Sequence, residues 1–171
     1  MNVADEHRRY APEKLRFAVV TASDSRREAE DDSGSRIAAM ATASGHTVVS
    51  RTLVRDDRDR IRAAVEIAAT AADVVVLNGG TGFSPRDVSV DAVTPILERR
   101  IEGFGELFRL LSHRQIGAAA MLSRATAGIV GRSAVFVIPG SPAAVELAMR
   151  ELILPESAHL IGQLQRGSSS P

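Results

Sequence analysis

The chain has 171 residues, a formal net charge of zero and 44% hydrophobic residues, which predicts a single soluble domain. It contains no cysteine, which excludes disulfides, thiolate metal sites and a cysteine nucleophile. Lys14 is the only lysine, so a catalytic or Walker lysine is not expected. Basic and acidic residues number 21 each, and this balance gives no indication of a nucleic-acid or anionic-membrane partner.

The two ends of the chain differ in composition from the body. Residues 1–14 are charged and aperiodic and predict a mobile arm, and the Ser-rich residues 167–171 predict a flexible tail. Residues 15–166 form the predicted single domain. No apolar run reaches the length of about 18 residues that a membrane span requires, and the first residues do not resemble a signal peptide. We therefore expect a cytoplasmic protein.

Apolar runs that are typical of buried strands alternate with segments of helical periodicity. Strands are predicted over residues 17–20, 46–54, 74–77 and 134–138. Helices are predicted over about 33–43, 61–69, 90–97, 104–111 and after Ser141, with Pro155 kinking or restarting the last one. The pattern over residues 121–130 is ambiguous.

This alternation predicts an α/β fold in three layers, with a mostly parallel sheet and helices on both faces. In such sheets ligands bind beyond the carboxyl ends of the strands. The segments that follow the predicted strands are rich in small polar, acidic and glycine residues: 23–25, 56–57, 78–87 and 139–142. This clustering is the main functional signal that the residues themselves provide.

The segment 79–82 has the sequence Gly-Gly-Thr-Gly and joins a predicted strand to a predicted helix. Its glycines permit positive φ and close approach of the backbone to a ligand. Its N–H groups, with the Thr81 hydroxyl, could bind phosphate. The loop is neither a GxGxxG nor a Walker motif. The alternative interpretation is a tight turn that requires glycine for its conformation alone.

Two aspartates are candidate Mg²⁺ ligands. Asp87 lies beside Arg86 just beyond the glycine loop, where an acid would repel a phosphate unless a cation lay between them. Its alternative role is a helix N-cap. Asp56 lies nearest the end of its strand, whereas Asp57 and Asp59 fit the solvated start of a helix.

Two further loops also allow either a structural or a ligand-binding interpretation. Asp31 and Asp32 either complement the dipole of the following helix or form a polar lid over a cleft. The Pro-Gly-Ser-Pro segment at 139–142 is either a simple helix start or a second loop that binds an anion or a ring. No histidine pair has the spacing of metal ligands, and no GxSxG elbow is present.

The loop and its surroundings resemble the MoaB/MogA family of molybdenum cofactor biosynthesis proteins over about residues 16–165. Residues 79–89, GGTGFSPRDVS, match the GGTG-x-x-x-RD-[VT]-[ST] signature of that family. Further similar motifs follow the same order along the chain: TASD at 21–24, DDSG at 31–34, LVRDD at 53–57, GFGE at 103–106, LSR at 122–124 with AG at 127–128, and PGSP at 139–142.

The resemblance implies that the protein is a molybdopterin adenylyltransferase. Such an enzyme transfers AMP from Mg-ATP to the terminal phosphate of molybdopterin and releases pyrophosphate. The attacking phosphate oxygen is already ionised, so positioning and charge neutralisation suffice. This requirement fits a site of glycines, hydroxyls and aspartates.

The resemblance also implies a role for each candidate residue. Asp56 and Asp87 would be the catalytic acids and hold Mg²⁺. The residues that would bind substrate or phosphate are Ser23, Asp31, Gly79, Gly80, Thr81, Gly82, Arg86, Ser123, Pro139, Gly140 and Ser141. A homotrimer or homohexamer is implied, and a downstream molybdenum-insertion protein is a further expected partner.

Two other functions remain open on the sequence. A catalytically silent oligomer of the MoaB branch would bind molybdopterin but would not turn over Mg-ATP. An unrelated nucleotide-binding domain of the same doubly wound class would show no selectivity for the pterin.

Overall fold

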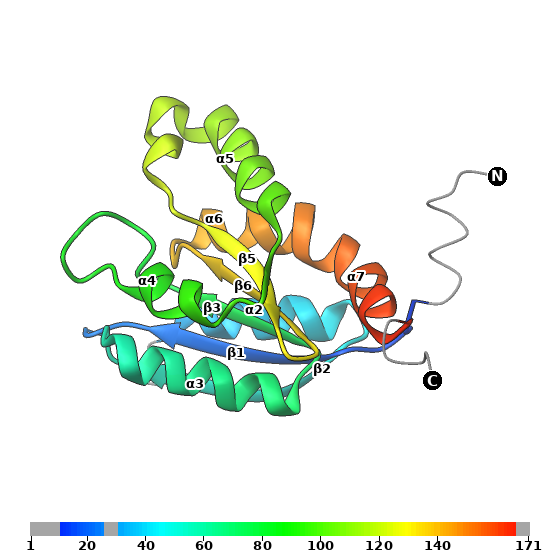
Figure 1. Ribbon diagram of the computed structural model, residues 1–171. Coiled ribbons are helices and arrows are strands. Elements are labelled where there is room, and N and C mark those ends of the chain that lie inside the picture. Colours follow the sequence, from blue (N-terminus) through cyan, green and yellow to red (C-terminus); the bar gives the residue numbers. More distant parts are fainter. Residues whose placement is uncertain (1–10, 26–30, 167–171) are drawn as a thin grey trace.

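A computed structural model describes residues 11–25 and 31–166 (Figure 1). The first ten residues of the predicted arm and the whole predicted tail lie outside the described residues. The described strands form a six-stranded sheet in the order β2-β1-β3-β6-β5-β4. Their bounds are β1 Arg16–Ala22, β2 Thr47–Val54, β3 Val74–Asn78, β4 Arg99–Arg100, β5 Thr126–Val130 and β6 Ser133–Ile138.

The sheet is mostly parallel, and this confirms the predicted fold class. Strands β2, β1, β3 and β6 pair in parallel, whereas β5 and β4 are antiparallel to their neighbours. Thr21 of β1 pairs with Asn78 of β3, and Asn78 pairs with Ile138 of β6. The three central strands therefore end at the same level, and their following loops emerge side by side.

Helices cover both faces of the sheet, as predicted. Those that pack on one face are α2 Asp32–Ala43, α5 Glu102–Ile116, α6 Pro142–Ala148 and α7 Leu154–Arg166. Those that pack on the other face are α3 Arg58–Ala71 and α4 Ser89–Val93.

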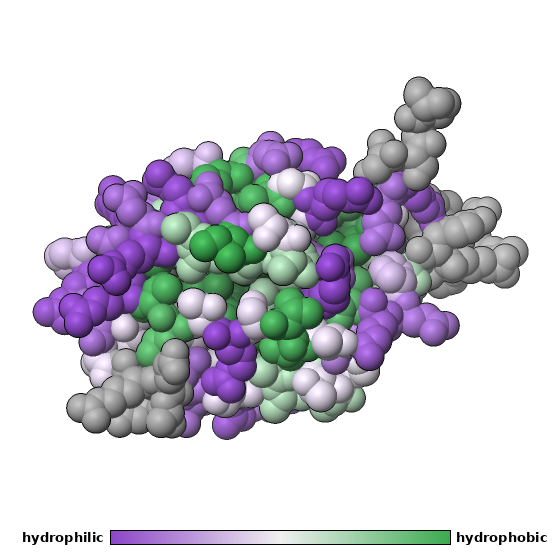
Figure 2. Space-filling model, turned by 90° about the horizontal axis from the view of Figure 1, so that it is seen from below, coloured by the Kyte–Doolittle hydropathy of each residue, from purple (hydrophilic) through white to green (hydrophobic). Residues whose placement is uncertain are grey.

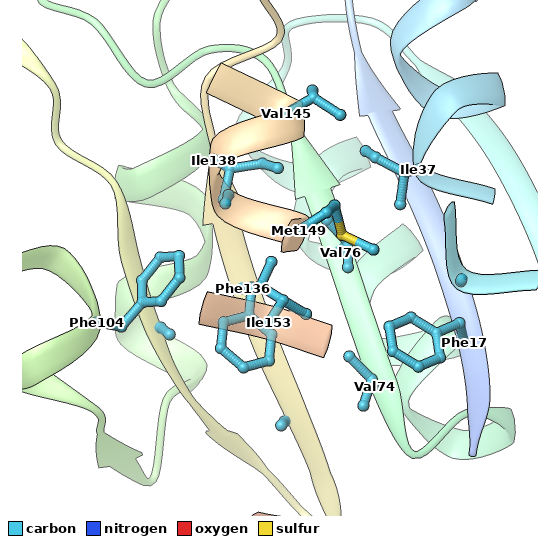
Figure 3. Packing of buried hydrophobic residues seen from close by; sticks show 14 of the residues in the cluster. Phe17, Ile37, Val74, Val76, Phe104, Phe136, Ile138, Val145, Met149 and Ile153 are labelled. Atoms are coloured by element: carbon cyan, nitrogen blue, oxygen red, sulfur yellow. The ribbon is translucent and has the colours of Figure 1, made fainter. Parts of the chain in front are cut away.

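Each face of the sheet has its own core, because successive strand side chains point to opposite sides. Val74 and Val76 join one apolar cluster, whereas Val75 and Leu77 join the other. Both faces of the central strands are thus buried, which explains why β3 is apolar without interruption. Figure 3 shows the first cluster, in which Ile37 of α2 and Met149 lie over the central strands.

Three segments differ from the sequence-based expectation or resolve its ambiguity. The predicted helix over 90–97 is wrong in length, because α4 ends at Val93 and a 3₁₀ turn, Thr94–Ile96, contains Pro95. The ambiguous segment 121–130 ends a 3₁₀ stretch, Gly117–Leu122, and then forms β5. Two-residue β4 is too short to give a pattern.

The final helix changes its winding near the proline that was expected to kink or restart it. A π-helical turn, Met149–Ile153, lies between α6 and α7, and Pro155 is the second residue of α7. Proline has no N–H to donate and crowds the carbonyl four residues earlier. The wider turn accommodates this loss, and the chain continues as a helix without a break.

Apolar side chains remain exposed on two separate surfaces. One consists of Leu107, Leu110, Met121 and Leu122 on α5 and the following 3₁₀ stretch. The other is a groove of about 530 Å³ between β2 and α3, lined in part by Leu53, Val54, Ala64 and Ile67. Figure 2, seen from the side of α3, shows apolar side chains gathered within a hydrophilic rim. No helix in the described part of the chain is long and apolar enough to cross a membrane.

The packing of α2 on the sheet predicts the cost of a cavity at Ile37. This side chain is fully buried, so Ile37→Ala should lower the free energy of unfolding by about 2–5 kcal/mol. The conservative control, Ile37→Val, should cost about 0.5–1.5 kcal/mol. Urea denaturation measures both values, and equal losses for the two variants would contradict the packing.

Candidate functional site

Four buried polar residues join the carboxyl ends of β1 and β3 to the start of α2. Asn78 donates from Nδ2 to Thr21 Oγ1 at 2.9 Å, and Thr21 Oγ1 donates to Asp31 Oδ2 at 2.9 Å. Ser33 Oγ donates to Asn78 Oδ1 at 2.7 Å. Asp31 is the N-cap of α2 and accepts from the Gly34 amide at 2.9 Å. Asp31 therefore holds the base of the site together through bonds within the protein.

The glycine loop leaves β3 directly above this network. Gly79 and Gly80 have φ of +97° and +64°, as the predicted need for glycine requires. A Cβ on Gly79 would lie 2.3 Å from the Ala22 carbonyl oxygen, and one on Gly80 would lie 2.5 Å from Ser89 Oγ. At these two positions the backbone is therefore packed too closely for a side chain, and both the positive φ and the close approach demand glycine.

The loop also presents hydrogen-bond donors. Among the described residues, no acceptor is bonded to the amides of residues 80–83, whereas the Gly79 amide bonds to the Ile138 carbonyl at 3.0 Å. The buried Ser89 hydroxyl, which lies against Gly80, likewise has no partner in the described part of the chain. Consecutive unbonded N–H groups are the arrangement that binds an anion.

Asp56 and Asp24 bond to each other's backbone across the ends of β2 and β1. The Asp24 amide donates to Asp56 Oδ2 at 3.0 Å, and the Asp56 amide donates to Asp24 Oδ1 at 3.2 Å. The second Asp56 oxygen, Oδ1, is buried and has no partner among the described residues. Burial raises the pKa of the Asp56 carboxyl, and the charges of Asp24 and Asp87 add to the shift. The hydrogen bond from the Asp24 amide and the charge of Arg86 partly oppose it.

Asp87 lies close enough to Asp56 for their charges to interact. Its Oδ2 accepts from the Ser84 amide at 2.9 Å, which folds residues 84–87 into a turn. A Cβ on Gly82 would lie 2.8 Å from this oxygen. Asp87 does not cap α4, whose N-cap residue is Val88, so the alternative role as a helix cap does not apply.

A cleft of about 360 Å³ opens between three loops at this edge of the sheet. It brings together seven of the predicted site residues: Gly80, Thr81, Gly82, Asp87, Ser123, Pro139 and Gly140. Ala119 and Leu122 complete the lining. A larger hollow of about 530 Å³ lies at the opposite edge around Arg16 and Asp73, away from the glycine loop. The smaller cleft is the better candidate site because the loop donors and Asp87 line it, although Asp56 does not.

The remaining predicted residues lie around the cleft and do not line it. Gly79 lies behind it, 3.5 Å from the Cβ that Gly140 would carry. Ser23 donates its amide to Val54, and Ser141 is the N-cap of α6. Arg86 is exposed. Asp57 caps α3 by accepting from the Arg60 amide at 2.9 Å, in agreement with its expected structural role.

Three residues at the site were not selected individually from the sequence, although Asp24 and Asn78 lie in segments that it marked as functional. Asn78 and Asp24 follow or end predicted strands, but nothing in the pattern shows the network or the backbone exchange that they form. Arg124 belongs to the LSR motif, whose serine alone was selected as a site residue. Its guanidinium bonds to the glycine loop more than forty residues away in the sequence.

The acids fit a divalent cation that is held mainly by its substrate. No group of three or more His, Cys, Asp and Glu residues that could bind a metal occurs within residues 11–25 and 31–166. Mg²⁺ is usually held by one or two carboxylates together with phosphate oxygens and water. The buried and unpartnered Oδ1 of Asp56, with Asp87 nearby, matches that donor set.

The sheet and its loops define an α/β protein that can bind a ligand beyond the carboxyl ends of parallel strands. A family model described as "Probable molybdopterin binding domain" matches residues 18–159, and the chain belongs to this family. Within it, the chain belongs to the MoaB/MogA group, as the resemblance predicted. Membership assigns the chain to molybdenum cofactor biosynthesis.

Similar proteins span nearly the whole chain. Molybdenum cofactor biosynthesis protein B of Bacillus anthracis is 47% identical over 164 residues, which cover 94% of this chain and 97% of the relative. The Escherichia coli K12 protein of the same name is 39% identical over 143 residues, covering 82% and 84%. A crystal structure of a molybdenum cofactor biosynthesis protein B has a TM-score of 0.86 at 46% identity, covering 91% and 99%. The tungsten cofactor synthesizing protein MoaB of Pyrococcus furiosus has a TM-score of 0.82 at 35% identity, covering 91% and 99%.

The raised pKa of Asp56 predicts how this residue affects stability as pH changes. In the unfolded chain the carboxyl ionises at its ordinary, lower pKa, so folding opposes ionisation. The resulting destabilisation is absent below the ordinary pKa. It grows as pH rises toward the pKa of the folded state and is complete above that pKa. Asp56→Asn should therefore melt at a higher temperature than wild type at pH 7 without metal. The difference should vanish near pH 3, and thermal denaturation at both pH values measures it.

Proposed function

We propose that this protein is a molybdopterin adenylyltransferase that transfers AMP from Mg-ATP to the terminal phosphate of molybdopterin. The observation that carries the proposal is the unpartnered Asp56 Oδ1, with Asp87 nearby and a glycine loop whose amides lack partners among the described residues. Molybdopterin is the substrate that family membership supports. The nucleotide and Mg²⁺ are supported by the chemistry of the donors.

The reaction joins two anions that repel each other, and each part of the cleft would reduce that repulsion or hold the phosphates in place. A molybdopterin phosphate oxygen attacks the α-phosphorus of ATP, and the bond from that phosphorus to the pyrophosphate oxygen breaks. The attacking oxygen is already ionised at neutral pH, so the site needs no strong general base. The amides of Gly80 and Gly82 and the hydroxyl of Thr81 would bind the phosphate oxygens and hold them in line.

The carboxylates have a complementary task. Asp56 and Asp87 would hold Mg²⁺, which neutralises phosphate charge when it is bound. Asp24 fixes one Asp56 oxygen through its amide, so the other oxygen keeps its orientation. The turn around Ser84 fixes one Asp87 oxygen in the same manner. Both acids are therefore oriented by backbone donors before any ligand arrives.

We further propose that the chain forms a homotrimer or homohexamer. Exposed apolar side chains on α5 and the following 3₁₀ stretch support a contact between copies, since Leu110 and Met121 are 55% and 74% exposed. A hexamer built from two trimers needs a second interface. The separate groove between β2 and α3 supports one. Binding of a downstream molybdenum-insertion protein stays a prediction.

Activity should depend on Asp87. Asp87→Asn removes the negative charge but retains an oxygen that can accept from the Ser84 amide, so the fold should persist. We expect turnover to fall by about 10²–10³-fold, the loss that removal of one transition-state electrostatic group typically causes. The assay incubates the protein with molybdopterin, ATP and Mg²⁺ and quantifies adenylylated molybdopterin and pyrophosphate.

Asp57→Asn is the matched control, because Asp57 lies next to Asp56 but caps α3, a role that asparagine also fills. It should keep the wild-type rate. A wild-type rate for Asp87→Asn would refute the assigned role of that residue. No product from the wild-type protein, together with retained molybdopterin binding, would instead identify a silent binding oligomer.

The oligomer should depend on the exposed face of α5. Leu110→Glu places a charge within this apolar surface and should convert the assembly to a monomer, whereas Leu110→Met should leave it intact. Size-exclusion chromatography with light scattering measures the mass of each form. A monomeric wild-type protein would contradict the proposed assembly.

A further inference from the structure

Arg124 connects the start of β5 to both ends of the loop that carries Asp87. Its Nε donates to the Gly82 carbonyl at 2.9 Å, and its Nη2 donates to the Asp87 carbonyl at 2.6 Å. Its backbone amide donates to the Thr81 carbonyl at 3.1 Å. The guanidinium also lies 5.4 Å from the centre of the Phe83 ring. One residue thus bonds to three carbonyls of residues 81–87.

The charge of Arg124 is already paired. Its Nη1 and Nη2 contact the Asp91 carboxylate of α4 at 3.1–3.2 Å, in a two-pronged arrangement. The side chain of Arg124 is only 24% exposed. All three nitrogens of the guanidinium donate to Gly82, Asp87 or Asp91, so the geometry directs the guanidinium to the protein and not to a phosphate.

These bonds orient the loop amides. In a trans peptide the carbonyl and the following N–H point in opposite directions. Because the carbonyls of Thr81 and Gly82 point toward Arg124, the amides of Gly82 and Phe83 point away from it. These are two of the amides that have no acceptor among the described residues. The bond to the Asp87 carbonyl fixes the backbone from which the Asp87 carboxylate projects.

We propose that Arg124 is a positioning residue for the phosphate-binding loop, which it shapes through backbone carbonyls while Asp91 balances its charge. The inference rests on the proposed function for its kinetic consequence, but its structural consequence is independent of any substrate. The opposite alternative is that Arg124 is itself a phosphate ligand. The two roles predict opposite effects of removing Asp91.

Asp91→Ala is the decisive variant. If Arg124 is a positioning residue, loss of Asp91 loosens the guanidinium, and kcat/KM for Mg-ATP should fall by about tenfold. If Arg124 were a phosphate ligand, the same variant would free its charge for ATP, and kcat/KM would rise. An increase would therefore overturn the proposal.

Arg124→Lys provides a second, independent test. Lysine keeps the charge, but its single ammonium cannot reproduce the planar fork that reaches Gly82, Asp87 and Asp91 together. We expect Arg124→Lys to lose nearly as much kcat/KM as Arg124→Ala, about tenfold to a hundredfold. A wild-type kcat/KM for Arg124→Lys would show that the positive charge alone matters and would refute the positioning role.

Amide hydrogen exchange tests the loop without substrate. The amides of Ser84, Asp87 and Ser89 bond within residues 80–89 and depend on the shape of the loop. Arg124→Ala and Asp91→Ala should increase their exchange at least severalfold. Unchanged exchange would overturn the proposal even if the enzyme reaction were confirmed. Faster exchange in a protein that makes no product would support the positioning role and refute the proposed function.

Arg16→Ala is the matched control for general loss of stability. Arg16 makes a two-pronged pair with Asp73 at the opposite edge of the sheet, with Nη2 to Oδ1 at 2.8 Å. Its removal should lower the melting temperature without changing exchange at Ser84, Asp87 and Ser89 or the kinetics with Mg-ATP. Equal loop exchange in Arg16→Ala and Arg124→Ala would show that global destabilisation, not loop positioning, explains the effect.

Discussion

The parallel pairing of β1, β3 and β6 is the constraint on which the site depends. Because Thr21, Asn78 and Ile138 lie in register, the loops that follow them start at one level and come together. The approach is so close that Gly79 has no room for a side chain beside the Ala22 carbonyl. The sheet geometry therefore requires glycine here, and the proposed phosphate binding depends on the unbonded amides of this loop.

Without a cation, the aspartates of such a site would repel the phosphate that the unbonded amides attract. The two kinds of group are separated in the structure. The glycine loop supplies positive dipoles, and Asp24, Asp56 and Asp87 place negative charge beside it. Burial raises the pKa of the Asp56 carboxyl, and the charges of Asp24 and Asp87 add to that shift. A divalent cation between the acids and a polyphosphate satisfies both groups at once. In the proposed function, the clustered acids would be the half of the binding site that Mg-ATP completes.

Much of this arrangement could be predicted from the sequence because the signals are local. Apolar runs marked the central strands, the glycines marked the tight loop, and Asp57 and Ser141 carried the composition of helix starts. Other features depend on contacts between distant segments. The 3₁₀ turn that ends α4 early and the two-residue β4 have no periodicity of their own. The Asn78 network and the Asp24–Asp56 exchange exist only after β1, β2 and β3 are side by side.

Arg86 and Arg124 show why sequence patterns did not reveal the role of Arg124, whose bonds connect distant segments. An arginine read from the sequence suggests a surface charge or a phosphate ligand, and Arg86, which the family resemblance selected as a phosphate-binding residue, is exposed. Arg124 is instead partly buried, paired with Asp91 and bonded to the carbonyls of Gly82 and Asp87. Its planar fork suits this task, since one rigid group can satisfy several acceptors at fixed angles. A loop rich in glycine has little rigidity of its own, so bonds from outside the loop, such as those of Arg124, restrict its shape.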